Sequence, residues 1–285
     1  MPINAKIIAR SCDAKNLNSE IITFELEYPR FIHSEFMTHR VFSRNGTSSR
    51  AIPIKKQIGY IIESTAYPIS WGKNKSGMQA TEIIEDTDNA YKVWDSARDC
   101  AVMHAENLIN LGIHKQVSNR ILEPFSHMKV VLTSTEFSNW FELRDHSDAQ
   151  PEIQELAKQM KKAMQETSTR KLQPNEWHVP YYNDGFWNDE CEENLEDALA
   201  ISASCCAQVS YRKLDDSLEK AKKIYAQLIE SKPIHASPFE HQAHPMNIDK
   251  EWKEIPGITH VDKNDNFWSN NFKNWIQYRS ILHSE

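Results

Sequence analysis

Glycine is scarce in this chain, and its placement excludes the two commonest nucleotide-binding architectures. Only 7 of the 285 residues are glycine. None of them stands in the GxGxxG spacing of Rossmann folds or the GxxxxGKS/T spacing of P-loops, where glycine lets the backbone approach a phosphate closely. If this protein binds a nucleotide, it must therefore do so with another architecture.

Hydrophobic periodicity predicts a mixed fold of helices and strands. Residues 21–28, "IITFELEY", alternate apolar and polar side chains as a half-buried strand does, and Pro29 ends the alternation. Apolar residues recur at helical spacing from 89 to 111, and Gly112 is well placed to end that helix. Because 40% of the residues are hydrophobic and no low-complexity linker divides the chain, we predict an α+β fold in one compact domain over residues 1–285.

The remaining elements follow from the same kinds of pattern. Further helices are expected in the segments 30–42, 136–146, 148–164, 194–211 and 216–231, and a strand at 128–135. We expect an extended loop at 64–80, an irregular aromatic segment at 166–192 and a closing amphipathic segment at 271–282.

Charge and cysteine content narrow the class of protein. The net charge of −7 argues against a nucleic-acid coat protein, because that binding needs a broad cationic field. The five cysteines are odd in number and lack CxxC spacing, which favours a reducing, cytoplasmic location, and the Cys205–Cys206 pair is predicted to be buried core. No apolar run approaches the roughly 18 to 20 residues of a membrane span, and the N-terminus lacks the apolar core of a signal peptide. We therefore expect neither a nucleic-acid nor a membrane partner.

Residues 37–53, "MTHRVFSRNGTSSRAIP", concentrate three arginines, one histidine and five hydroxyl side chains in an acidic chain. One interpretation is a solvated loop in which His39 and Arg40 end a helix, with basic side chains suited to the negative end of its dipole. The other is an anion site, since guanidinium groups bind phosphate through paired hydrogen bonds and nearby hydroxyls add donors. The pattern alone leaves both open.

Arg120 and Arg144 stand among apolar residues, in "NRILEPF" and "WFELRDH". An unpaired charge would be costly to bury there. Either carboxylates pair with these arginines or a ligand does, and a structural ion pair is the default for each.

The segment "HASPFEHQAHP", residues 235–245, holds three histidines and a glutamate. His235, His241 and His244 suggest a zinc site, but their spacing matches none of the usual ligand patterns. Glu240 could instead orient a histidine or bind a ligand amide. We therefore predict no metal site, and a zinc-dependent hydrolase remains the minor alternative.

At these residues the chain resembles the flavin-dependent thymidylate synthases, whose signature is RHRxxSxNExSxRY. The segment "THRVFSRNGTSSRA" keeps its histidine, second arginine, serines, asparagine and last arginine in register. "NRILEP" and "NWFELRDHSDAQPEIQELA" resemble the family's ARxVLP and NFxxLRxxxxAQxEIxxYA segments. "CAQVSY" and "HASPFEH" resemble its AARVSY and HxSPFEH segments. The resemblance implies a central, mostly antiparallel sheet flanked by helices.

The order of these segments differs from that of an ordinary family member. HxSPFEH normally precedes the RHR motif, whereas "HASPFEH" follows it here. The C-terminal "NNFKNWIQYRSIL" also resembles a family helix that usually follows HxSPFEH. We therefore interpret the chain as circularly permuted.

The resemblance also implies roles for individual residues. Arg144 is expected beside the pyrimidine, where it would stabilise charge on the ring. The expected flavin contacts are His39, Arg40, Asn139, Ser210, His235, Ser237 and Glu240. The expected substrate contacts are Glu35, Arg44, Ser48, Arg50, Arg120 and Arg144. The family's active site is shared between the subunits of a homotetramer, so we expect the same assembly.

Three positions depart from the family pattern. Thr38 replaces the first arginine of RHR, Gly46 replaces the glutamate, and Glu35 stands where the family has a substrate-binding glutamine. Arg44 is a candidate to supply the charge that is missing at Thr38. A carboxylate at Glu35 would accept a hydrogen bond from a cytosine-like donor edge, which leaves dUMP and dCMP both open as substrates.

The implied reaction is a flavin-dependent methylation. NADPH reduces FAD, methylenetetrahydrofolate delivers a one-carbon unit to C5 of dUMP, and reduced flavin supplies the hydride that completes the methyl group of dTMP. No enzyme nucleophile is required, so Ser48 is predicted to be a ligand contact. The alternatives are hydroxymethylation of a deoxypyrimidine monophosphate on the same scaffold, and a flavin- or nucleotide-binding protein that has lost catalysis.

Overall fold

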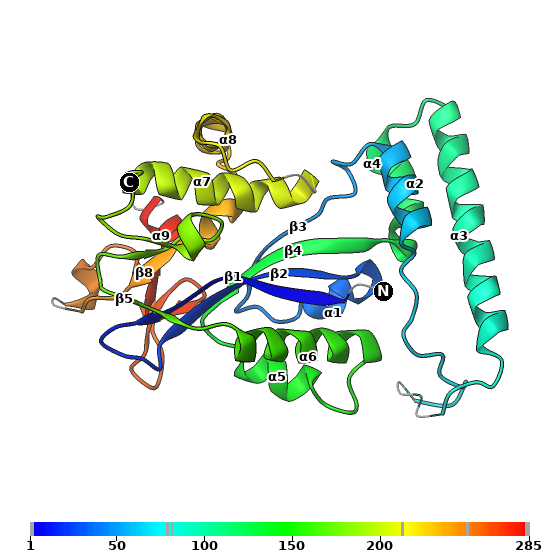
Figure 1. Cartoon of the computed structure of the whole chain (residues 1–285), viewed down its shortest axis with the longest axis horizontal. Helices are drawn as coiled ribbons and strands as arrows, with labels where there is room; N and C mark the ends of the chain where they lie inside the picture. The colour runs from blue at the N-terminus through cyan, green and yellow to red at the C-terminus, as the bar shows by residue number, and fades with distance from the viewer. Residues whose placement is uncertain (1–2, 78–79, 81, 212–213, 249–250, 283–285) are drawn as a thin grey trace.

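A five-stranded sheet forms the centre of the molecule (Figure 1). The structure is a computed structural model that describes residues 3–77, 80, 82–211, 214–248 and 251–282. The strand order is β3-β4-β2-β1-β5, and every neighbouring pair is antiparallel except β1 with β5, which confirms the predicted α+β class. The strands are β1 (Asn4–Asp13), β2 (Glu20–Pro29), β3 (Ser43–Gly46), β4 (His127–Ser134) and β5 (Arg170–Leu172).

Strand β2 is the predicted half-buried strand, but the structure buries more of it than the pattern indicated. One face, which includes Phe24 and Leu26, packs against α6 (Pro151–Glu166). On the opposite face Ile21 and Thr23 have no exposed surface. The C-terminal segments cover this second face, and a local alternation cannot reveal a cover that comes from distant residues.

Helices α2 (Ile54–Glu63), α3 (Thr87–Asn110) and α4 (Lys115–Ser118) stand to one side of the sheet (Figure 1). Gly112, at φ +80°, ends α3 as predicted. Its N–H donates to the carbonyl of Ile109, and the N–H of Ile113 donates to that of Leu108, which is a Schellman motif. The predicted loop at 64–80 contains no helix in its described part, and residues 78 and 79 lie outside the described residues.

Helices α7 (Leu195–Gln208) and α8 (Leu218–Glu230) pack together on the far side of the sheet from α5 (Ser138–Arg144) and α6 (Figure 1). Cys205 and Cys206 are buried in α7, as predicted. No helix in the described part of the chain is long and apolar enough to cross a membrane. The remaining short elements are α1 (His33–Phe36) and the 3-10 helices η1 (Arg30–Ile32), η2 (Asn119–Phe125), η3 (Asn183–Gly185), η4 (Val209–Tyr211), η5 (Ser237–Glu240) and η6 (Trp252–Glu254).

The C-terminal segment was predicted from its resemblance to a family helix, and only its end is helical. Asn270 and Asn274 adopt positive φ angles of 53° and 61°, and these turns interrupt any helix. Trp275 and Ile276 are both buried, which strand pairing permits. The elements here are β8 (Ala243–Pro245), β9 (His260–Val261), β10 (Phe267–Ser269), β11 (Phe272–Lys273), β12 (Trp275–Gln277) and α9 (Tyr278–Leu282). The segment at 166–192 likewise contains β6 (Trp177–His178) and β7 (Phe186–Trp187).

Candidate active site

The motif at residues 37–53 starts as a turn and continues as an edge strand. Helix α1 ends at Phe36, so His39 and Arg40 lie beyond it, and Ser43–Gly46 form β3. The expected helix at 30–42 is therefore wrong beyond Phe36, and the structure does not support the interpretation of the motif as a solvated loop after a helix. Strand β3 pairs with β4, and Asn45 is buried. The ladder hydrogen bonds offered by β4 explain why the segment is extended.

Arg144, at the end of α5, joins the predicted site residues Glu35 and His39, and also Thr38, into one cluster. One guanidinium nitrogen pairs with the carboxylate of Glu35. Nε donates to His39 Nε2 at 3.0 Å, and Nη2 donates to Thr38 Oγ1 at 3.3 Å. The side chain of Arg144 is only 16% exposed, and the carboxylate compensates for this burial. Of the two alternatives for Arg144, the structure shows the ion pair.

His39 is neutral at physiological pH. Its burial, and then the positive charges of Arg144 and Arg44, lower the pKa of the imidazole to about 4. Because Nε2 accepts the hydrogen bond from Arg144, the single proton of the neutral ring is on Nδ1. The indole of Trp140 packs edge-on against this ring at 4.8 Å. The cluster thus combines a fixed cation with a neutral histidine.

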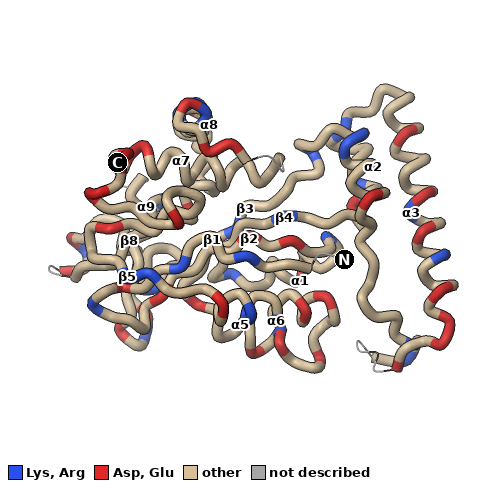
Figure 2. The backbone as a smooth tube through the Cα atoms, in the orientation of Figure 1, with Lys and Arg blue, Asp and Glu red and all other residues tan. Residues whose placement is uncertain are grey.

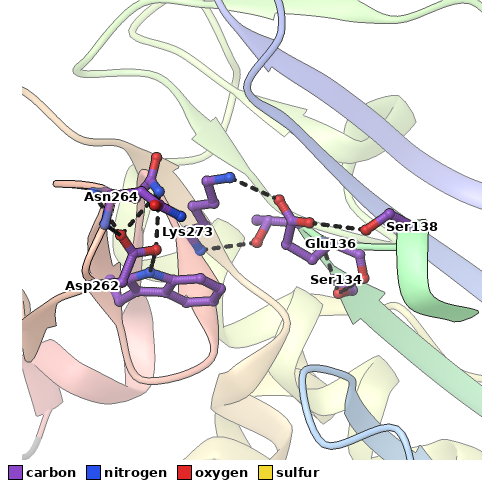
Figure 3. Close-up of polar contacts among 9 residues, drawn as sticks. Ser134, Glu136, Ser138, Asp262, Asn264 and Lys273 are labelled. Atoms are coloured by element: carbon purple, nitrogen blue, oxygen red, sulfur yellow. Dashed lines mark hydrogen bonds and ion pairs between the residues drawn. The ribbon is translucent and has the colours of Figure 1, made fainter.

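A cleft of about 470 Å³ opens beside this cluster. One wall comes from the motif and α5, including His39, Arg40 and Asn139. The opposite wall comes from the C-terminal hairpin, which we define as residues 259–273 (Figure 3). The cleft therefore gathers three of the predicted flavin contacts. The hairpin residues that line it are Asp262, Asn264, Asn266, Trp268 and Lys273, and sequence reasoning missed all of them. The turn-forming run "DKNDN" at 262–266 indicates a hairpin but not its neighbour.

The donor set of the cleft fits the ring system of a flavin. The half-buried Trp268 supplies an aromatic surface, Asn139 is exposed, and Trp140 lies buried behind the cleft. The indole N–H of Trp140 is buried and has no hydrogen-bond partner among the described residues. A flavin ring carries carbonyl acceptors for such donors. The residues of this cleft that would hold the ring are therefore His39, Asn139 and Trp140.

Three predicted substrate contacts lie outside this cleft, Ser48 and Arg50 on the loop after β3 and Arg120 on η2. Ser48 is half-buried and its N–H donates to the carbonyl of Ser210 at 3.2 Å, while Arg50 is exposed. Arg120 pairs with Glu123 at 2.9 Å, which is again the structural ion pair. Lysines at the start of α2 add further positive charge near this loop (Figure 2). Arg44 donates instead to the carbonyls of Met37 and His39 and supports the turn.

The remaining predicted flavin contacts lie apart from the cleft. Ser210 Oγ donates to the carbonyl of Gly46 at 3.4 Å. Glu240 pairs with Arg279 of α9, and His235 lines a separate cleft between α7 and α8. Within one chain, the predicted flavin contacts are therefore divided between this cleft and other places in the fold.

A network of buried, hydrogen-bonded polar side chains crosses the sheet behind the motif. His178 Nδ1 lies 2.9 Å from Ser11 Oγ, and His178 Nε2 lies 2.8 Å from Thr23 Oγ1. Thr23 Oγ1 lies 2.7 Å from Thr133 Oγ1, which lies 2.8 Å from His241 Nδ1. The other nitrogen of His241 is 3.4 Å from the Asn45 amide, and this amide also faces the carbonyl of Ser237 at 3.2 Å. This hydrogen-bonded network connects the C-terminal segments to β3.

Replacing Thr133 by valine is expected to lower the free energy of unfolding by about 2 kcal/mol. Valine keeps the shape of the side chain, but it leaves Nδ1 of His241 without its partner in a site with no exposed surface. Chemical denaturation at neutral pH measures the effect, with the half-exposed Thr87→Val as the matched control. Equal free energies of unfolding of the two variants would show that this hydrogen-bonded network does not stabilise the fold.

The histidines of "HASPFEHQAHP" have separate partners. His241 belongs to the buried hydrogen-bonded network, and the ring of His244 packs against Trp177 with 4.5 Å between the ring centroids. No group of three or more histidine, cysteine, aspartate or glutamate side chains that could hold a metal occurs among the described residues. The arrangement gives the zinc alternative no support.

Comparison with known proteins identifies the family. The family model described as "Thymidylate synthase complementing protein" (Thy1) matches residues 6–168, which span β1 to α6 and include the Arg144 cluster. The chain belongs to the Thy1 family. It is therefore a thymidylate synthase-like methyltransferase, and the flavin dependence of Thy1 proteins supports FAD as its cofactor. The hairpin and "HASPFEH" lie outside the matched Thy1 region.

Two solved structures are similar to this Thy1 protein over part of its length. Both are of the UMP/dUMP methylase PolB from Streptomyces cacaoi, bound with 5-Br dUMP or with 5-Br UMP. The identities are 15% and 16%, and the TM-scores are 0.48 and 0.47. Each comparison covers 61% of this chain, and 92% or 91% of the methylase. No curated protein matches the chain in sequence.

Proposed function

We propose that this protein transfers a one-carbon unit from methylenetetrahydrofolate to C5 of a deoxypyrimidine monophosphate, converting dUMP to dTMP with FAD as cofactor and NADPH as reductant. The observation that carries the proposal is the Arg144 cluster beside the cleft, within the region that the Thy1 model matches. Family membership supports the reaction class, and the geometry supports this place for it.

Arg144 is the catalytic residue in this proposal. Its ion pair with Glu35 and its hydrogen bond to the neutral His39 hold the guanidinium in one orientation. A fixed cation stabilises negative charge on a pyrimidine ring as C5 becomes nucleophilic. The flavin, when bound, supplies the hydride that completes the methyl group. His39, Arg40 and Asn139 would contact it from the cleft wall.

The separation of the predicted residues supports a shared active site. Ser48 and Arg50 lie on the loop after β3 and Arg120 lies on η2, whereas His39 and Asn139 line the cleft. A homotetramer could bring the loop of one subunit to the cleft of another, as we expect from the resemblance. Ser210, His235, Ser237 and Glu240 would contact the flavin from the permuted C-terminal half.

The decisive experiment combines colour with turnover. The purified protein is expected to be yellow from bound flavin and to release tritium from 5-tritiated dUMP when it receives methylenetetrahydrofolate and NADPH. Product mass then separates a methyl from a hydroxymethyl product. A colourless protein that gains no flavin on incubation with FAD would contradict the proposal. Flavin without any tritium release would support a binding protein that has lost catalysis.

Glu35 supports dCMP as the second candidate substrate. The Arg144 pair uses one of its carboxylate oxygens, and the other can accept a hydrogen bond from an amino group. The change Glu35→Gln is expected to shift the ratio of kcat/KM for dUMP over dCMP by about tenfold toward dUMP. Tritium release from the two labelled nucleotides measures this ratio.

The matched control for this prediction is Glu142→Gln, an exposed glutamate on α5. It should leave the ratio as it is in the wild type. If Glu35→Gln lowers turnover of both nucleotides equally, the role of Glu35 is to hold Arg144 and not to select the base.

A further inference from the structure

The C-terminal hairpin is fixed to the motif, so it is a permanent wall of the cleft. The backbone N–H of Lys273 donates to Thr135 Oγ1 at 2.9 Å, directly before α5. Asn271 Nδ2 donates to the carbonyl of Val41 at 3.2 Å and to Ser43 Oγ at 3.0 Å. These bonds reach the motif itself. The hairpin and the motif therefore line the cleft together.

Asp262 organises the tip of the hairpin (Figure 3). Its Oδ1 accepts from the backbone N–H groups of Asn264 at 2.8 Å and Asn266 at 3.0 Å. Its Oδ2 accepts from the indole N–H of Trp268 at 3.0 Å. The bond from Trp268, followed by those from Asn266 and Asn264, holds the pKa of this carboxyl well below its usual range. Both oxygens are thus occupied by donors of the hairpin itself.

The described residues that line the cleft include one arginine, Arg40 of the motif, and one lysine, Lys273 of the hairpin. Arg40 is exposed and has no hydrogen bond or ion pair with any other described residue. Lys273 is 30% exposed and pairs with Glu136 at 3.1 Å (Figure 3). An ammonium group has three N–H donors, and the described residues occupy one of them. Thr38, on the same cleft, carries no charge, and Arg44 is bound to backbone carbonyls.

We propose that Lys273 is an anion-binding residue of this cleft and that, together with Arg40, it binds a phosphate group of the ligand. The inference rests on the proposed function, since that function brings phosphate esters to this site. Arg40 offers a planar pair of donors and Lys273 of the hairpin a compact charge, and the two together suit the oxygens of a phosphate group. The phosphate could belong to the flavin or to the nucleotide.

The competing interpretation is that Lys273 and Glu136 only hold the hairpin against α5. The two interpretations predict opposite effects of Glu136→Gln. If Lys273 binds phosphate, loss of the competing carboxylate frees the ammonium and tightens phosphate binding several-fold. If the pair is only a latch, its loss loosens the wall and weakens binding.

The test compares ligands with and without phosphate, using the full chain. Dissociation constants are measured by calorimetry for FMN against riboflavin, for dUMP against deoxyuridine, and for inorganic pyrophosphate. Lys273→Met is expected to weaken the phosphorylated member of one pair, and pyrophosphate, by about tenfold or more. The unphosphorylated member should change less than twofold. The pair that responds identifies the source of the phosphate.

The controls separate charge from structure. Lys273→Arg keeps the charge and should retain phosphate binding. Lys253→Met removes an exposed lysine that lies over the Trp252 ring and should change nothing. An equal loss for both members of each pair, or no loss in Lys273→Met, overturns the inference. Pyrophosphate binding that depends on Lys273 in a protein without tritium release would keep this inference and reject the proposed function.

Discussion

Replacing Arg144 by methionine is expected to lower kcat by about a hundred- to a thousandfold, which corresponds to about 3 to 4 kcal/mol in the barrier. The substitution removes the cation that would stabilise charge on the pyrimidine. It also leaves Glu35 unpaired and takes the donor away from His39. Tritium release from labelled dUMP at saturating substrate measures kcat.

Two variants define the meaning of that loss. Arg98→Met removes an arginine that is ion-paired with Asp95 on α3, and it should retain full activity. Arg144→Lys keeps the charge but lacks the branched guanidinium that reaches Glu35, Thr38 and His39 together. Its kcat should therefore lie between those of the wild type and of Arg144→Met. If Arg144→Met retained more than a tenth of the wild-type kcat, a catalytic role of Arg144 would be contradicted.

Acid is expected to destabilise the fold well before its carboxylates titrate. Burial lowers the pKa of His178 and of His241 to about 3, so both are neutral in the folded protein. In the unfolded chain these histidines titrate near pH 6.5. Between about pH 6.5 and 3 the unfolded chain therefore binds protons that the folded chain does not. Stability is complete above that window and is lost as the pH falls through it.

The expected loss between pH 7.5 and 5 is about 2 kcal/mol for each of these two histidines. Denaturant unfolding at both values measures the difference, and no carboxylate with an ordinary pKa titrates strongly in this interval. Unchanged stability from pH 7.5 to 5 would mean that the buried rings are not neutral in the fold. The exposed His146→Gln variant should show the same pH dependence as the wild type.

Much of the secondary structure could be predicted because its signals are local. The alternation at 21–28 and the helical repeat ending at Gly112 each depend on residues a few positions apart. Both predictions are confirmed. The errors occurred where a distant segment decides the local conformation. Strand β3 is extended because β4, far along the chain, pairs with it, and the segment 271–282 bends into strands because β8 offers an edge to Trp275.

The site was predictable in its parts and not in its assembly. Motif spacing indicated His39, Asn139 and Arg144; His39 and Asn139 line one cleft, and Arg144 donates a hydrogen bond to His39 beside it. The ion pair between Glu35 and Arg144 was an open alternative, because a sequence does not state which carboxylate meets which arginine. Lys273 carried no signal at all.

The sequence by itself determined the family, the strand and helix periodicities and the residues able to bind an anion or a ring. Only the tertiary structure decided that Arg144 meets Glu35 and that Lys273 and Arg40 line the same cleft. The physical reason is chain closure. Contacts between residues more than a hundred positions apart depend on how the whole chain packs, and no local pattern of side chains encodes them.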